Sequence, residues 1–154
     1  MQKFILLPLV ALCFISAAQA QAQVRVKDAW VRATVTQQKV TGAFMQLNSA
    51  QDARLIEARS PVAATVELHQ MEMVGNVMEM RAIPGLDLPA GKTVELSPGA
   101  YHIMLIGLKA QVREGDIIPI SLVIEGRDKK RETIEVKAIA KPLHQANGHL
   151  MPVH

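Results

Sequence analysis

Short runs of β-forming residues recur about every 10 residues along most of the chain, and clusters of turn-forming residues separate them. No segment shows a long apolar period of about 3.6 residues, so little helix is expected. Many short strands at this spacing are typical of an antiparallel β-sandwich or barrel. The expected strands cover residues 24–27, 30–34, 43–47, 54–60, 65–71, 77–83, 93–96, 101–108, 117–125 and 133–138.

The chain length of 154 residues suits a single domain, and a hydrophobic fraction of 49% suits a packed core. The sequence has no internal repeat and no interdomain linker. The predicted organisation is a leader over residues 1–20, one β-sandwich domain over residues 21–140 and a tail over residues 141–154. Trp30, the only tryptophan, is expected to anchor the core of the sandwich.

The first 20 residues have the pattern of a secretory signal peptide. Lys3 precedes an apolar run over residues 4–15, and Ala18 and Ala20 form a small-x-small cleavage signal. The apolar run is shorter than the roughly 20 residues that a membrane-spanning helix needs. The pattern predicts export with cleavage after Ala20 or Ala22, and no stable membrane insertion of the mature protein.

The only cysteine, Cys13, lies within this leader. A lipoprotein signal has a small residue before its cysteine, whereas Leu12 stands there, so lipidation is not expected. The mature chain then has no thiol, which excludes disulfides, thiolate catalysis, cysteine zinc sites and blue-copper centres. The formal charge of +3 without a basic run, with only 3% aromatic residues, also argues against a nucleic-acid partner.

Methionine and histidine gather in the middle of the chain. Five of the eight methionines lie between two histidines or next to them, and the set is His69, Met71, Met73, Met78, Met80, His102 and Met104. The strand period of two separates His69 from the apolar face of its strand and puts His102 and Met104 on one face. A tight hairpin at residues 75–76 would bring Met80 beside the strand of His69.

Two imidazoles and two thioethers at one place would suit Cu(I). Thioethers are soft neutral donors that favour Cu(I) over Zn²⁺, Mg²⁺ or Ca²⁺, and imidazole strengthens such a site. Methionine also supplies sulfur in an oxidising compartment without forming disulfides. Spacing alone leaves packing open as the alternative, because methionine is a common core filler. Met71, Met73 and Met78 are expected to be core filler or a sulfur-rich rim.

The spacing of these residues resembles the signature of periplasmic copper chaperones of the PCu(A)C family. His69 is followed after ten residues by Met80, and after twenty-one more by His102-Ile103-Met104. The flanking segments over residues 28–34, 66–69, 75–81 and 99–108 are also similar, and the resemblance covers about residues 24–138.

The resemblance implies an all-β, cupredoxin-like Greek-key antiparallel β-sandwich with an exposed Cu(I) site. His69, Met80, His102 and Met104 take the four ligand roles in this resemblance. It further implies a periplasmic protein that delivers copper to the copper centres of cytochrome c oxidase during assembly, beside a thiol-bearing copper chaperone.

Three other functions are alternatives to copper delivery. Copper sequestration for resistance needs the same site, so the sequence does not separate the two. A mononuclear copper oxidase or dismutase would prefer more nitrogen ligands, and no enzyme activity is expected. A metal-free adhesion or assembly sandwich is the third alternative.

The tail holds a second group of metal donors. Three of the five histidines and one methionine fall in its last eleven residues, namely His144, His149, Met151 and His154. Three imidazoles favour Cu(II), so a weaker Cu(II) site is the functional interpretation. A solvated terminus is the alternative, since prolines and a glycine in the tail discourage regular structure.

Overall fold

The computed structural model describes residues 23–142, and these residues form ten strands and no helix. The all-β prediction is therefore confirmed. Among the described residues there is accordingly no helix long and apolar enough to cross a membrane. The strands are β1 Val24–Arg32, β2 Val40–Ser49, β3 Ala53–Arg59, β4 Ala63–Val74, β5 Val77–Ala82, β6 Leu86–Leu88, β7 Thr93–Leu96, β8 Tyr101–Leu108, β9 Ile117–Gly126 and β10 Arg131–Lys141.

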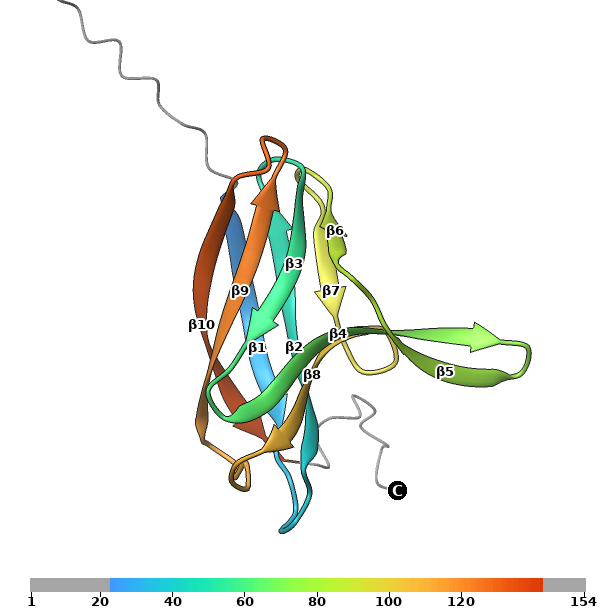
Figure 1. Cartoon of the computed structure of the whole chain (residues 1–154), viewed down its shortest axis with the longest axis vertical. Helices are drawn as coiled ribbons and strands as arrows, with labels where there is room; N and C mark the ends of the chain where they lie inside the picture. Colours follow the sequence, from blue (N-terminus) through green and yellow to red (C-terminus); the bar gives the residue numbers. More distant parts are fainter. Residues whose placement is uncertain (1–22, 143–154) are drawn as a thin grey trace, which may run out of the picture.

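One continuous hydrogen-bonded sheet folds over into the two layers of a cupredoxin-like sandwich. The strand order is β5-β4-β8-β7-β2-β1-β10-β9-β3-β6, with an additional pairing of β8 with β2. The parallel pairing of β1 with β10 joins the two layers, and Trp30 lies opposite Ile139 there. Figure 1 shows β10, β9 and β3 facing the layer that holds β1, β2 and β8.

The hydrophobic core fills the space between the layers. Ile103 and Leu105 of β8 and Ala43 of β2 have no exposed surface, and Leu122 of β9 meets them from the other layer in the same core cluster. Because successive side chains of a strand alternate between faces, the residues next to Ile103 point away from the core. We call this second surface, on β1, β2, β8 and β4, the outer face.

Two expected strands, over residues 24–27 and 30–34, form the single strand β1 with a bulge between Lys27 and Trp30. Asp28 takes a left-handed conformation, with φ of 51°. The extra residue of a bulge shifts the alternation by one position, so Trp30 stays on the outer face with Lys27. The prediction that Trp30 anchors the core is therefore wrong, and its ring stacks on Phe44 at 4.4 Å between centroids.

Strand β6 was not expected from the sequence, because Pro84, Gly85 and Pro89 indicate turns on both sides of it. Leu86 and Leu88 are nevertheless buried, and the strand pairs with residues 53–55 of β3. It lies at the edge of the sheet, where flanking prolines do not interrupt a hydrogen-bond ladder. At the other end of the chain, β10 extends to Lys141.

The β4–β5 hairpin projects from the sandwich (Figure 1). β4 pairs with β8 as far as Gln70, and beyond that residue it pairs only with β5. Gly75 closes the turn with φ of +62°, a conformation that residues with a Cβ rarely adopt. Every residue of β5 is exposed, so the hairpin offers its side chains to solvent.

Replacing Ile103 with alanine is expected to destabilise the fold by about 2–5 kcal/mol, because it opens a cavity in a site with no exposed surface. The matched control is Ile139→Ala at an exposed position of β10, which should change stability by less than about 1 kcal/mol. Urea unfolding would measure both as a shift in midpoint at constant slope. Equal shifts for the two variants would contradict the position assigned to the core.

Candidate metal centre

Two histidines meet side by side on the outer face. His69 of β4 and His102 of β8 are directly opposite each other in the antiparallel register. Their ring centroids lie 5.6 Å apart, with 56° between the ring planes. Side chains of directly opposite residues share a face, so the pairing of these two strands alone brings the two imidazoles together.

The two sulfur donors predicted from the sequence border the same histidine. Met80 of β5 places its Sδ 3.2 Å from Nε2 of His102. Met104 follows His102 by two residues and therefore shares its face of β8. A pocket of about 200 Å³ opens here, and it is lined by Arg32, Gly42, Phe44, Met71, Met80, Pro98, His102 and Met104.

The structure thus brings Met80, His102 and Met104 around one pocket, with His69 adjoining His102. It adds Met71, which lies directly opposite Met80 in the hairpin. Of the two roles expected for Met71, core filler and sulfur-rich rim, its place in the pocket lining fits the rim. The predicted turn at residues 75–76 already indicates that Met71 lies opposite Met80. The pairing of Val74 with Val77 beside this turn fixes the register of the rest of the hairpin.

His69 has one free ring nitrogen within the described part of the chain. Its Nε2 lies 2.8 Å from Oε2 of Glu67, whereas its Nδ1 is buried and has no hydrogen-bond partner there. Buried polar atoms of this kind are normally paired, because an unpaired one costs free energy. An imidazole with an unpartnered nitrogen fits the role of a metal ligand.

His102 is nearly buried, with 6% of its surface exposed. Burial lowers the pKa of His102, and the charges of His69 and Arg32 act in the same direction. A contact of 3.3 Å between Nδ1 and the carbonyl oxygen of Ala100 opposes this effect on the pKa. The imidazole is therefore neutral at neutral pH, which is the form that coordinates metals.

An aromatic and a basic side chain, Phe44 and Arg32, also line the pocket. The Phe44 ring lies over Gly42, where a Cβ would come within 2.8 Å of Cζ of the ring. The guanidinium of Arg32 sits 5.7 Å from the centroid of the same ring. Any larger residue at position 42 would displace the ring that supports His102, whose own ring lies 6.3 Å from it.

The donor set restricts the kind of metal. Among residues 23–142, nowhere do three or more histidine, cysteine, aspartate or glutamate side chains gather closely enough to hold an ion. The pocket itself is lined by three thioethers, from Met71, Met80 and Met104, and by the imidazole of His102. Thioethers select soft ions such as Cu(I), so the chemistry of the pocket fits copper rather than zinc, magnesium or calcium.

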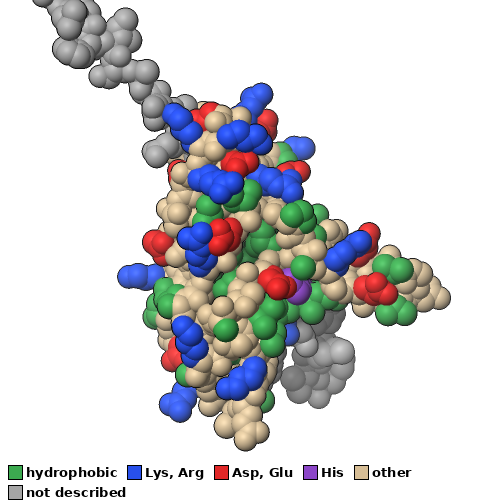
Figure 2. Space-filling model, viewed as in Figure 1, with side chains coloured by type: hydrophobic (Ala, Val, Ile, Leu, Met, Phe, Trp, Pro, Cys, Tyr) green, Lys and Arg blue, Asp and Glu red, His purple; other side chains and the backbone are tan. Residues whose placement is uncertain are grey.

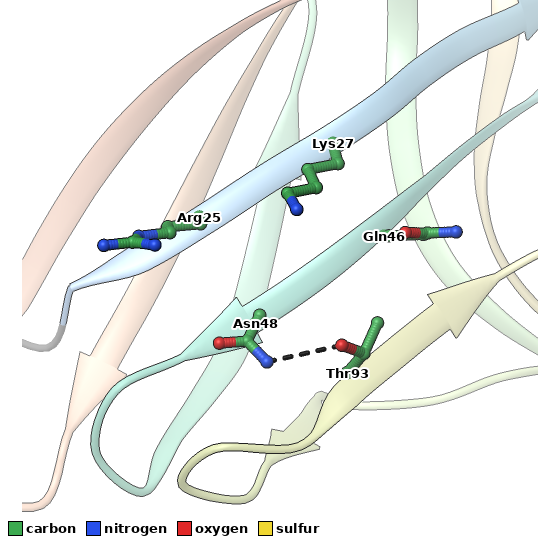
Figure 3. Close-up of a pocket in the computed structure, with 5 residues that line it drawn as sticks. All are labelled: Arg25, Lys27, Gln46, Asn48 and Thr93. Carbon is green, nitrogen blue, oxygen red and sulfur yellow. Dashed lines mark hydrogen bonds between the residues drawn. The ribbon is translucent and has the colours of Figure 1, made fainter.

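A second pocket, of about 240 Å³, lies farther along the outer face and has a different character. Figure 3 shows Arg25 and Lys27 on β1, Gln46 and Asn48 on β2, and Thr93 on β7. Asn48 donates a hydrogen bond of 3.3 Å to the hydroxyl of Thr93. No imidazole or sulfur lines this pocket, so the soft donors occupy the β4–β8 end of the outer face.

Two predictions lie outside the described residues. The signal peptide over residues 1–20 is one of them. The other is the Cu(II) site of the tail, with His144, His149, Met151 and His154. Both stay predictions.

The two-layer fold is that of a PCuAC-like domain. The structure resembles the apo PCuAC domain of PmoF2, with a TM-score of 0.64, 19% identity and coverage of 80% of this chain and 94% of that one. It also resembles the solution structure of CuI-DR1885 from Deinococcus radiodurans, with a TM-score of 0.60 and 30% identity. That match covers 82% of this chain and 83% of the other.

More narrowly, the chain belongs to the LpqE-like family, which is named for lipoproteins and whose pattern matches residues 24–138. The protein Lxx21020 of Leifsonia xyli subsp. xyli, also named as a lipoprotein, is 33% identical over 100 residues. The match covers 64% of this chain and 60% of that relative, so the chain spans less than two thirds of the relative's length.

The metal-free protein is expected to lose stability as the pH falls below about 6.5. The folded-state pKa of His102 lies below its ordinary value of 6.5, so the unfolded chain takes up this proton first and acid favours unfolding. Unfolding between pH 7.5 and 5.5 would measure the loss, and His102→Gln should reduce it. A variant with the full wild-type loss would show that His102 does not cause it.

Proposed function

We propose that this protein binds one Cu(I) through His69, Met80, His102 and Met104 and carries it as cargo. The observation that carries the proposal is the 3.2 Å approach of the Met80 sulfur to the His102 ring, between residues far apart in sequence. The solution structure of the relative DR1885, which is 30% identical to this chain, is that of CuI-DR1885, and this supports copper as the ion.

The proposed site suits an ion that is held and then released. All four donors are neutral, so Cu(I) keeps its single positive charge beside Arg32, and the site does not trap it by charge neutralisation. Met80 is 51% exposed and lies on the edge strand β5. An acceptor could therefore displace Met80 first and take over the remaining ligands one at a time.

The recipient that we propose is the set of copper centres of cytochrome c oxidase during assembly, reached directly or through a thiol-bearing copper chaperone. This rests on the resemblance to periplasmic copper chaperones. A thiolate partner is chemically reasonable because thiolate binds Cu(I) more strongly than thioether. The protein would act as a carrier and not as an enzyme, because copper is moved without being used.

The compartment that we propose is the periplasm. The lipoprotein names of the family and of the relative from Leifsonia xyli support export to the cell envelope. The leader over residues 1–20 would direct that export. Sulfur from methionine instead of cysteine suits an oxidising compartment.

A competition titration of Cu(I) against a chromogenic chelator is expected to give about one strong equivalent for the domain. His102→Ala and Met104→Ala should each weaken binding at least about tenfold, equal to about 1.4 kcal/mol. Met104→Leu keeps the apolar volume and removes only the sulfur, so it should lose as much affinity as the alanine variant. The matched control is Gln46→Ala on the outer face away from the pocket, which should bind normally. Unchanged affinity in all the His102 and Met104 variants would contradict the proposed site.

Deletion of the gene distinguishes delivery from sequestration. Delivery predicts a loss of oxidase activity that added copper restores, because a high copper supply replaces the carrier. Oxidase activity and growth at raised copper concentration are the two measurements. Copper sensitivity with normal oxidase activity would instead identify the protein as a sequestration protein.

A further inference from the structure

Between residues 71 and 80, one face of the β4–β5 hairpin is made of methionine. Met71 lies directly opposite Met80, and Met73 lies directly opposite Met78. Opposite residues share a face, and so do residues two apart on one strand. The four thioethers therefore form two consecutive rungs that lead from the hairpin tip to the pocket.

The other face of the hairpin is polar along the same length. Gln70 lies opposite Arg81, Glu72 lies opposite Glu79, and Arg81 forms an ion pair with Glu72. In Figure 2, hydrophobic side chains lie on this projecting arm beside acidic and basic ones. Polar pairs thus alternate with the methionine pairs, and the polar face ends in the apolar pair Val74 and Val77 at the turn.

The methionines at the tip do not serve the core. Met73 is 60% exposed and Met78 is 45% exposed. If an apolar strand face were all that was needed, β-branched residues would suit the strands better. Val74 and Val77 occupy the last rung on the polar face, so the hairpin uses valine there and methionine at all four positions of the other face. What methionine adds to an apolar side chain is sulfur.

We propose that Met73 and Met78 form a second, weaker Cu(I) site, and that Met71 and Met80 pass the ion between this site and the pocket. The inference rests on the proposed function, since it gives the primary site its entry and exit route. Two neutral thioethers without imidazole bind Cu(I) weakly, which suits a transient site.

The geometry of the hairpin allows this transfer. Directly opposite Cβ atoms lie about 4.5–5.5 Å apart, and the next rung on the same face is roughly 6–7 Å away. Methionine side chains have three rotatable bonds and reach across such gaps. Met71 and Met80 themselves line the pocket, so the rungs are continuous with it. At each step one thioether replaces another, and the copper stays Cu(I) throughout.

Titration with Cu(I) under anaerobic conditions, on protein labelled with ¹³C at the methionine methyl groups, tests the proposal. The first equivalent should shift the methyl signals of Met80 and Met104. The second should shift those of Met73 and Met78. The double variant Met73→Leu/Met78→Leu keeps the tip apolar and removes its sulfur. The control is Val74→Leu/Val77→Leu on the opposite face of the same turn.

The double variant Met73→Leu/Met78→Leu is also expected to load from a Cu(I) chelator more slowly, by roughly threefold or more, because its tip no longer raises the local concentration of the ion. The valine control should load at the wild-type rate. Three results would each overturn the proposal. The methyl signals of Met73 and Met78 could stay unmoved, or the second equivalent could move only that of Met151. The third result is a Met73→Leu/Met78→Leu variant that loads at the wild-type rate. Failure of the proposed function is separate, because it would leave Met80 and Met104 unmoved by the first equivalent.

Discussion

The hydrogen-bonded pairing of β4 with β8 is the constraint on which the rest of the site depends. It sets His69 opposite His102, and a slip of one residue would turn every side chain of a strand to the other face. Leu68 and Ile103, which are also opposite each other, bury their side chains in the core. The free energy of core packing therefore fixes the register that brings the imidazoles together.

Building the pocket on the outer face separates stability from ligand exchange. The core between the layers is closed, whereas the outer face combines a buried ring, His102, with an exposed sulfur, Met80. Phe44 and Gly42 hold the rigid side of the pocket, and the projecting hairpin supplies the other side. The pocket therefore has one preorganised side and one accessible side, and the proposed role as a copper carrier needs both.

Strand β4 keeps the alternation of its side chains although its two halves lie in different environments. Up to Gln70, β4 alternates between core and outer face, and beyond it the same alternation separates methionines from charged residues. The polar face keeps the arm in water, so the sulfur face can remain exposed without a core to cover it.

Local patterns in the sequence were sufficient for the all-β class, for the bounds of β7 and β8 and for the turn at Gly75. They also separated the two faces of each strand, which is why His102 and Met104 could be expected side by side. The same alternation does not tell which face another layer covers. Only the tertiary structure decided that Trp30 lies outside the core, because the bulge of β1 determines which face the ring takes. The local hairpin places Met71 opposite Met80, but only the pairing of β4 with β8 decided that this methionine face meets the pocket. Strand β6 likewise forms because it pairs with β3 and buries two leucines in the core, although the residues on both sides of it favour turns. Alternation is a property of neighbours in the chain, whereas burial depends on contacts between residues far apart in it.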